Sequence, residues 1–185
     1  LADGRVYAWG LNNDGQLGDG SRFSSVIPVE VTGLGGVTAV AAGNTHVLAL
    51  RNDGSVWAWG ANASGQLGIG GFALRRAPVA TAARDVVRIR AGGDVSLAIT
   101  RRRTGLAWGE NSNGQLGLAS LTANDLPSPV GVLSDVVDGS AADTLSLFVG
   151  ADGVLRTAGS NETGSLGDGT TTARGSYAPV NAVAS

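Results

Sequence analysis

Residues 57–70 read WAWGANASGQLGIG, and this stretch decides the fold because it recurs along the chain. Close copies stand at residues 7–20 (YAWGLNNDGQLGDG) and 106–117 (LAWGENSNGQLG), and a degenerate copy stands at 156–169 (RTAGSNETGSLGDG). Positions 9, 59, 108 and 158 are therefore separated by 50, 49 and 50 residues. A fixed period of this size indicates a repeat architecture.

Each complete period predicts four short strands. In the second period an apolar run at 37–42 is followed by a run at 46–50, the turn 52–54 (Asn-Asp-Gly) and a return strand at 55–59. Asp-Gly readily takes the positive φ that tight hairpin turns require. The fourth strand is expected to begin at a Pro-Val pair, because the first residue of a strand does not need its N–H. These pairs are Pro28-Val29, Pro78-Val79, Pro129-Val130 and Pro179-Val180.

The Gly-rich loop after each third strand is explained by folding alone. Its Asn can bond the backbone that follows, its central Gly can supply a left-handed residue, and its Leu can plug the loop into the core. The Trp before the loop is expected to give each unit a large buried anchor. The loop positions are Asn12, Asn62, Asn111 and Asn161; Gly15, Gly65, Gly114 and Gly164; and Leu17, Leu67, Leu116 and Leu166.

Repeats of about 50 residues with four strands each predict an all-β fold, a β-propeller built from four-stranded antiparallel blades. The pattern Trp-Gly-x-Asn-x-x-Gly-Gln-Leu-Gly-x-Gly, followed by Pro-Val, Val-x-x-Val-Ala-Ala-Gly-x-x-His and Leu-Ala-Leu, closely resembles the regulator of chromosome condensation (RCC1-like) repeat family. The resemblance covers essentially the whole chain and implies a seven-bladed propeller.

The strand count predicts about three and a half repeats, half of a seven-bladed ring. We expect one RCC1-like domain over residues 1–185, divided into a half unit (1–35), two units (36–84 and 85–134) and a degenerate unit (135–185). This organisation favours a fragment of a longer propeller, and the alternative is two copies that close one ring around a two-fold axis. In both cases unpaired blade edges favour self-association.

The composition is that of a globular domain. Of the 185 residues 43% are hydrophobic and 15% charged, with a net charge of −2, so the whole chain shows no attraction for nucleic acid or a membrane surface. No segment approaches about 18 consecutive apolar residues, so no transmembrane helix is predicted. The absence of Cys excludes disulfides, thiolate metal sites and cysteine nucleophiles. All 13 basic residues are Arg, which is typical of a high-GC bacterial coding sequence.

Residues suited to catalysis are few. His46 is the only His, and the equivalent positions hold Val95 and Leu145, so we interpret His46 as structural. The Gly-rich loops lack the Lys-Ser/Thr of a phosphate-binding loop, and no Ser/His/Asp set can be assembled. The sequence therefore predicts no enzyme, no catalytic residue and no cofactor.

A metal site is also not predicted. Residues 12–15 (Asn-Asn-Asp-Gly) with Asp19 faintly resemble a calcium loop. The copies at 62–65 and 111–114 lack the carboxylates that Ca²⁺ prefers, so the pattern is better explained as a turn.

Departures from the repeat mark the candidate partner-binding residues. Arg101, Arg102 and Arg103 replace the Asn-Asp-Gly turn of the third unit, while Arg75 and Arg76 precede a fourth strand. The alternative is that both clusters are simply solvated. Because the loop and the turn lie at opposite ends of a simple up-and-down blade, the two clusters are not expected to form one site.

A second departure lies in the first strand of each unit. One column holds Ala39, Arg88 and Asp138. Equivalent strands lie side by side around a ring, so we expect Arg88 to pair with Asp138 between blades. The alternative is two independently solvated side chains.

These patterns favour a non-enzymatic scaffold that binds an unidentified protein partner. The family resemblance leaves two alternatives: guanine-nucleotide exchange on a small GTPase, and inhibition of a secreted enzyme by the propeller rim, as in some bacterial members. No exchange residue of the family can be placed on this sequence. A bacterial-type member that is secreted or exposed at the cell surface is favoured over a cytoplasmic one.

Overall fold

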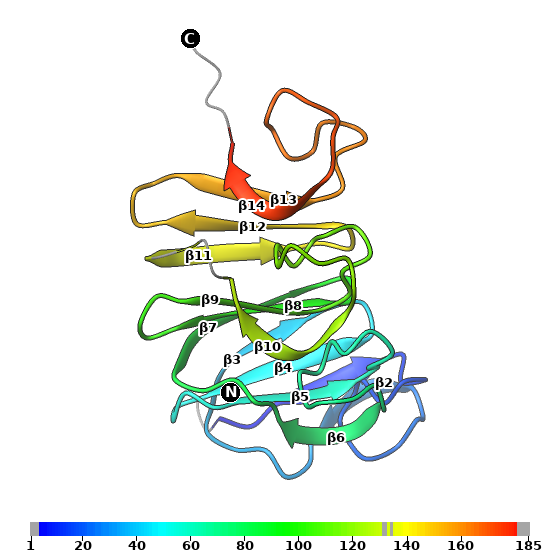
Figure 1. Cartoon of the computed structure of the whole chain (residues 1–185). Helices are drawn as coiled ribbons and strands as arrows, with labels where there is room; N and C mark the ends of the chain where they lie inside the picture. Colours follow the sequence, from blue (N-terminus) through cyan, green and yellow to red (C-terminus); the bar gives the residue numbers. More distant parts are fainter. Residues whose placement is uncertain (1–3, 131–132, 134, 181–185) are drawn as a thin grey trace.

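A computed structural model describes residues 4–130, 133 and 135–180, and over these residues the chain forms fourteen strands and no helix (Figure 1). The strands are β1 (Tyr7–Gly10), β2 (Ser25–Glu30), β3 (Val37–Ala42), β4 (His46–Arg51), β5 (Val56–Gly60), β6 (Arg75–Ala80), β7 (Val86–Gly92), β8 (Val95–Thr100), β9 (Gly105–Gly109), β10 (Asn124–Pro129), β11 (Val136–Ala141), β12 (Leu145–Gly150), β13 (Leu155–Gly159) and β14 (Arg174–Pro179). The unit limits expected at residues 1, 134 and 185 lie outside the described residues.

The strands form one two-stranded sheet and three four-stranded sheets. β1 pairs with β2, and β3–β6, β7–β10 and β11–β14 each form an antiparallel meander in chain order. The sheets lie one beside the next (Figure 1), and the first strand of each full sheet contacts that of its neighbour, β3 with β7 and β7 with β11. This is the arrangement of blades in a partial β-propeller, as the repeats predict.

The expected start of the fourth strands is wrong. β6 begins at Arg75 and β2 at Ser25, three residues before the prolines at positions 78 and 28. Pro129 and Pro179 instead end β10 and β14. Pro is tolerated inside these strands because each lies at the outer edge of its sheet, where one side of the ladder carries no partner strand.

The Trp column forms the joints between sheets. The Trp59 side chain is 1% exposed, and its indole N–H donates to the Gln16 carbonyl of the preceding loop at 2.9 Å. Trp108 repeats this bond to the Gln66 carbonyl, also at 2.9 Å. A Cβ on Gly18 would lie 2.7 Å from the Trp59 indole nitrogen, so the loop needs Gly there to admit the ring.

The expectation of a buried Trp in every unit is wrong at Trp9, which is 64% exposed. Trp9 lies in the two-stranded sheet, where no preceding loop covers it among the described residues. The same column becomes Ala158 in the last sheet, and Tyr177 of β14 fills the vacated space. A Cβ on Gly117 would lie 2.2 Å from the Tyr177 ring, so this ring replaces the indole against the preceding loop. Burial raises the pKa of the Tyr177 hydroxyl, which contacts Ser146 Oγ.

Candidate interaction surfaces

The polar side chains of the Gly-rich loops hold the loops themselves. The side-chain oxygen Oδ1 of Asn62 accepts from the Leu67 N–H at 2.9 Å. The side-chain nitrogen Nδ2 donates to the Gly71 and Ala73 carbonyls at 2.8 and 3.2 Å. The bond to the Leu N–H recurs at 2.9 Å in all four loops. The central Gly of each loop has positive φ, 76° at Gly65. The loop roles expected from the sequence are confirmed, and they leave these groups no part in binding chemistry.

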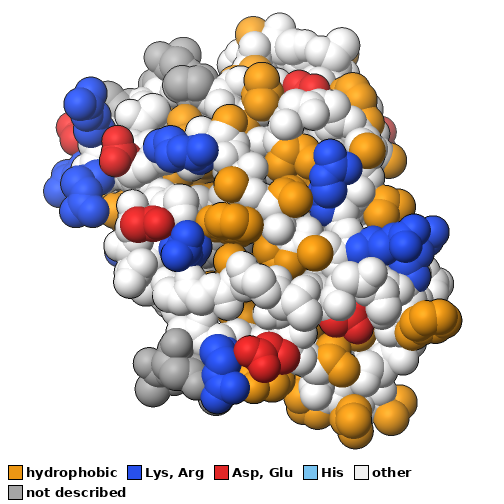
Figure 2. All heavy atoms as spheres, turned by 90° about the horizontal axis from the view of Figure 1, so that it is seen from below, with side chains coloured by type: hydrophobic (Ala, Val, Ile, Leu, Met, Phe, Trp, Pro, Cys, Tyr) orange, Lys and Arg blue, Asp and Glu red, His pale blue; other side chains and the backbone are white. Residues whose placement is uncertain are grey.

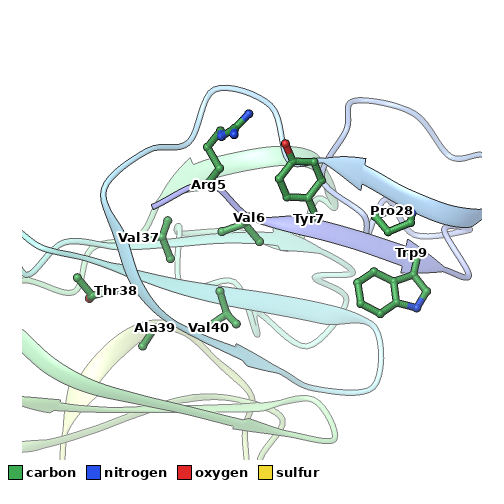
Figure 3. A pocket seen from close by; sticks show the side chains of 9 residues that line it. All are labelled: Arg5, Val6, Tyr7, Trp9, Pro28, Val37, Thr38, Ala39 and Val40. Atoms are coloured by element: carbon green, nitrogen blue, oxygen red, sulfur yellow. The ribbon is translucent and has the colours of Figure 1, made fainter. Parts of the chain in front are cut away.

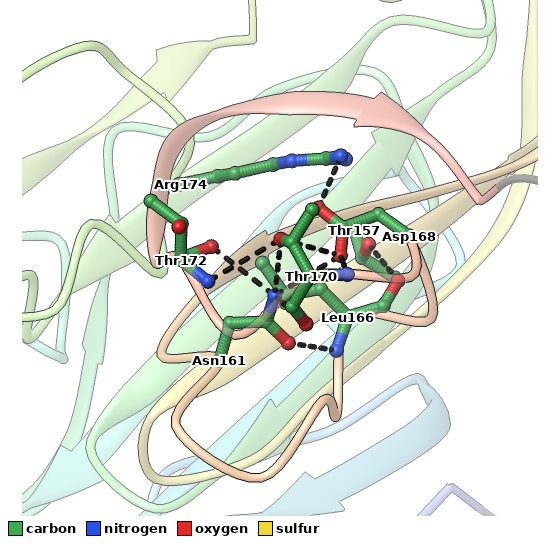
Figure 4. Close-up of polar contacts among 7 residues, drawn as sticks. All are labelled: Thr157, Asn161, Leu166, Asp168, Thr170, Thr172 and Arg174. Carbon is green, nitrogen blue, oxygen red and sulfur yellow. Dashed lines mark hydrogen bonds and ion pairs between the residues drawn. The ribbon is translucent and has the colours of Figure 1, made fainter.

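The Asp19 carboxylate of the calcium-like pattern and its equivalent Asp168 are bonded within their own loops. In the fourth loop the Asp168 carboxylate accepts from Asn161 Nδ2 at 3.1 Å and from the Thr170 N–H at 2.9 Å, and it pairs with Arg174 (Figure 4). The backbone bond from Thr170 is the main cause that lowers the Asp168 pKa. Asp19 in the first loop likewise accepts from Asn12 and Ser21. Among the described residues, no group of three or more acidic or His side chains is placed to hold a metal.

His46 is a buried link between two sheets. Ser96 Oγ donates to the Gln66 carbonyl at 2.8 Å and lies 2.8 Å from His46 Nε2. Because the one Ser96 proton goes to the carbonyl, His46 Nε2 carries the proton that it donates to Ser96. Burial lowers the His46 pKa to about 4, so the ring is neutral at pH 7. Nδ1 faces the Gly43 backbone, where an added Cβ would lie 2.6 Å away. This geometry supports a structural role.

The two predicted Arg clusters lie at opposite ends of the sheets. Arg101, Arg102 and Arg103 form the exposed turn between β8 and β9. Arg75 pairs in register with Gly60 at the far end of β5, away from the corresponding turn of that sheet. The structure therefore does not bring the two clusters together, as the up-and-down blade predicts.

A groove brings Arg88 to the turn. Its volume is about 250 Å³, and it is lined by Val87, Arg88, Ile99, Thr100, Arg101, Arg103, Val136 and Val137. Arg102 does not line it. The sequence singled out the turn but assigned Arg88 to another contact, because nothing in the repeat pattern reports which side chains meet at a joint between sheets.

The predicted pair of Arg88 with Asp138 is wrong. Asp138 instead accepts from Arg90 Nη2 at 2.6 Å, and Arg90 Nε donates to the Gly139 carbonyl at 3.1 Å. The Arg90 side chain thus contacts residues of β11 that precede its own equivalent, Ser140. Asp138 therefore forms its ion pair with Arg90, and Arg88 lines the groove.

Two further cavities follow the open edge of β1. The larger, about 610 Å³, is lined by residues of β1 and β3, and Figure 3 shows Trp9 and Val40 pointing into the space between these strands. The second, about 320 Å³, also includes Trp9 and Val40 and extends to His46 and Trp59. Figure 2 shows hydrophobic side chains spread over the centre and right of the face seen from below, with charged side chains among them. The edge of β1 is open because, within the residues that the structure describes, its sheet contains only β1 and β2.

The sequence matches the model of the regulator of chromosome condensation (RCC1) repeat at residues 3–50, 53–99 and 106–149, and a second model of the same repeat matches residues 37–66. The chain belongs to the RCC1 repeat family. Its RCC1 repeats are 49% identical over 49 residues to the E3 ubiquitin-protein ligase HERC2 of Homo sapiens and of Mus musculus. That match spans 25% of this chain but only 1% of HERC2, so the ligase activity in that name says nothing of these RCC1 repeats.

Three solved structures superpose on nearly the whole chain. Yeast RCC1 (Prp20) in a complex with Kap60 matches with a TM-score of 0.87 at 24% identity, over 98% of this chain and 45% of the matched one. Prp20p of Saccharomyces cerevisiae, described with its binding to Gsp1p and histones, gives 0.86 at 25% identity over 97% and 47%. Human WBSCR16 gives 0.83 at 24% identity over 96% and 47%. The chain spans about half the length of the two Prp20 structures, so it forms half of such a propeller.

The described residues contain no helix long and apolar enough to cross a membrane.

Proposed function

We propose that this chain is a non-enzymatic scaffold for binding another protein. The observation that carries the proposal is the use of the loop polar groups: Asn62 and its equivalents, and Asp168, are bonded within their own loops. The exposed groups left for recognition include Arg101, Arg102 and Arg103 on the turn face, and Arg76 with the half-buried Arg75 at the other end of the sheets. Rigid blades that present variable loops suit recognition better than turnover.

The alternative is guanine-nucleotide exchange on a small GTPase. It is supported by the likeness to Prp20p, whose described binding to Gsp1p concerns that protein. The test measures release of labelled nucleotide from a panel of small GTPases, beside capture of partners from a bacterial lysate and secretome. Specific capture without accelerated release supports the scaffold. Acceleration by orders of magnitude that one loop substitution abolishes would establish the exchange factor instead.

We also propose that residues 1–35, 36–84, 85–134 and 135–185 are the half unit and three units of a longer propeller chain. The two-stranded sheet holds the third and fourth strands of a blade. If two copies closed one ring, each would contribute a sheet with only the third and fourth strands of a blade. Neither copy would supply the first and second strands that complete these two blades. The missing pair is therefore expected from the same polypeptide, and the flanking gene sequence tests this: further RCC1 repeats support it, and their absence refutes it.

A further inference from the structure

We propose that the groove formed by Arg88, Arg101 and Arg103 binds a carboxylate on an extended, acidic segment of a partner protein. The inference rests on the proposed scaffold function and names the chemistry of its partner. It concerns the turn face only, at the joint between the sheet β7–β10 and the sheet β11–β14.

The three arginines reach the groove from separate parts of the chain. Arg88 follows the irregularity near the start of β7, where the pairing shifts between Val86 and Arg88. Arg101 and Arg103 belong to the turn after β8, and all three side chains line the same volume of about 250 Å³. The rest of the lining is Thr100 and four apolar residues, Val87, Ile99, Val136 and Val137. The groove thus combines arginines with apolar residues, which suits an acidic side chain next to an aliphatic one.

The positive charge of the groove is nearly uncompensated. Within the described residues Arg88 and Arg101 make no ion pair, and Arg103 approaches Asp135 only at 3.9 Å, with both side chains more than half exposed. An exposed pair at that distance contributes little, so Asp135 does not neutralise the groove. Asp138 is taken by Arg90 at 2.6 Å. Guanidinium groups bind carboxylates through paired, charge-assisted hydrogen bonds, so three arginines that line one groove favour an anion.

Arg103 occupies a backbone position that favours Gly. Its φ is +61°, and the corresponding residues of the sister turns are Gly54 and Gly153, at +79° and +75°. A side chain in the left-handed region costs free energy that Gly avoids. Strain of this kind is common where a side chain serves recognition.

The charge is specific to this joint. In the preceding sheet the positions equivalent to Arg88, Arg101 and Arg103 are Ala39, Asn52 and Gly54, none of them basic. The net charge of −2 and the shortness of the groove favour one or two carboxylates over a nucleic-acid backbone, which needs a long basic track.

The test uses a fluorescein-labelled peptide of alternating Glu and Val, and the same peptide with Gln in place of Glu, in fluorescence anisotropy at low salt. The Glu peptide is expected to bind and to weaken as salt rises from about 50 to about 300 mM, while the Gln peptide does not bind. Arg88→Gln, Arg101→Gln and Arg103→Gln are each expected to weaken binding at least about threefold. The matched control is Arg102→Gln, which removes a charge from the same turn but not from the groove and should change binding by less than about twofold.

Arg103→Gly separates recognition from folding. It should weaken peptide binding and at the same time raise the midpoint of thermal unfolding. A variant that lost binding because it unfolds would instead have a lower midpoint. If Arg102→Gln weakens peptide binding as much as the groove variants do, the peptide is attracted to the charge of the whole turn, and the groove is not its binding site. Binding of the Gln peptide, or no binding of the Glu peptide, would overturn the proposal that the groove recognises a carboxylate. A tenfold preference for a phosphoserine peptide would overturn it too. None of these outcomes bears on nucleotide release, so failure of the groove leaves the scaffold proposal to its own test.

Discussion

Replacing Trp59 by Ala should destabilise the fold strongly, and the same change at Trp9 should not. Both residues occupy one column of the repeat, with nearly identical flanking sequences, but their exposures are 1% and 64%. A buried indole removes about 200 Å² from water, worth about 5 kcal/mol at about 25 cal/mol per Å². The pair therefore tests whether the joint between sheets, rather than the local sequence, sets the energy.

The expected loss in the free energy of unfolding for Trp59→Ala is about 3–5 kcal/mol, as for other large-to-small core changes. The Gln16 carbonyl loses its indole donor, but Gln16 lines the adjacent cavity of about 320 Å³, so water can reach it. For Trp9→Ala the buried third of the ring predicts a loss of about 1–2 kcal/mol.

The measurement is the free energy of unfolding from urea denaturation, followed by far-UV circular dichroism, because both variants alter Trp fluorescence. The difference between the two losses should exceed about 1 kcal/mol with unchanged urea dependence. Equal losses would refute the reasoning, because they would mean that the column stabilises each unit without help from the neighbouring sheet.

Three further predictions follow from single contacts. The folded His46 pKa of about 4 lies below its unfolded value of about 6.5, so stability should be greatest above pH 6.5 and fall by up to about 3 kcal/mol towards pH 4. His46→Val should lose this part of the pH dependence, and identical urea curves against pH for both proteins would contradict the buried neutral ring. Arg103→Gly should raise the free energy of unfolding by about 1 kcal/mol, and a lower thermal midpoint would show that its φ of +61° is not strained. A double-mutant cycle on Arg90 and Asp138, 40% and 48% exposed, should give a coupling of about 0.2–1 kcal/mol at low salt, and zero coupling would mean two solvated side chains.

Much of the blade could be read from residues near one another in the chain. The strands expected at 37–42, 46–50 and 55–59 appear as β3, β4 and β5, and Gly54 takes the positive φ that the Asp-Gly turn requires. Asn62 bonds the loop that follows it, as its position predicts. These features depend on local turn chemistry and on a period-two pattern, so the sequence carries them directly.

The register of the fourth strand could not be predicted in the same way. Pro28 and Pro78 align, but Pro129 and Pro179 lie two residues later in the register, at the strand ends. The spacing of Pro-Val pairs concealed this shift, because intervals of 50 and 51 look regular in the sequence. One consequence is that Tyr177 takes the position of Pro78 in its sheet and reaches the joint left open at Ala158.

The sequence by itself determined the repeat, the four-stranded blade, the number of blades and the residues that shape each loop. The tertiary structure alone decided which members of a column are buried, that Trp9 is exposed and that Tyr177 replaces a Trp. It also decided that Arg88 lines a groove with Arg101 and Arg103 instead of pairing with Asp138. The physical reason is that local patterns fix the backbone within one sheet, whereas burial and side-chain pairing depend on the height and tilt of a neighbouring sheet about 50 residues away, which no short-range pattern encodes.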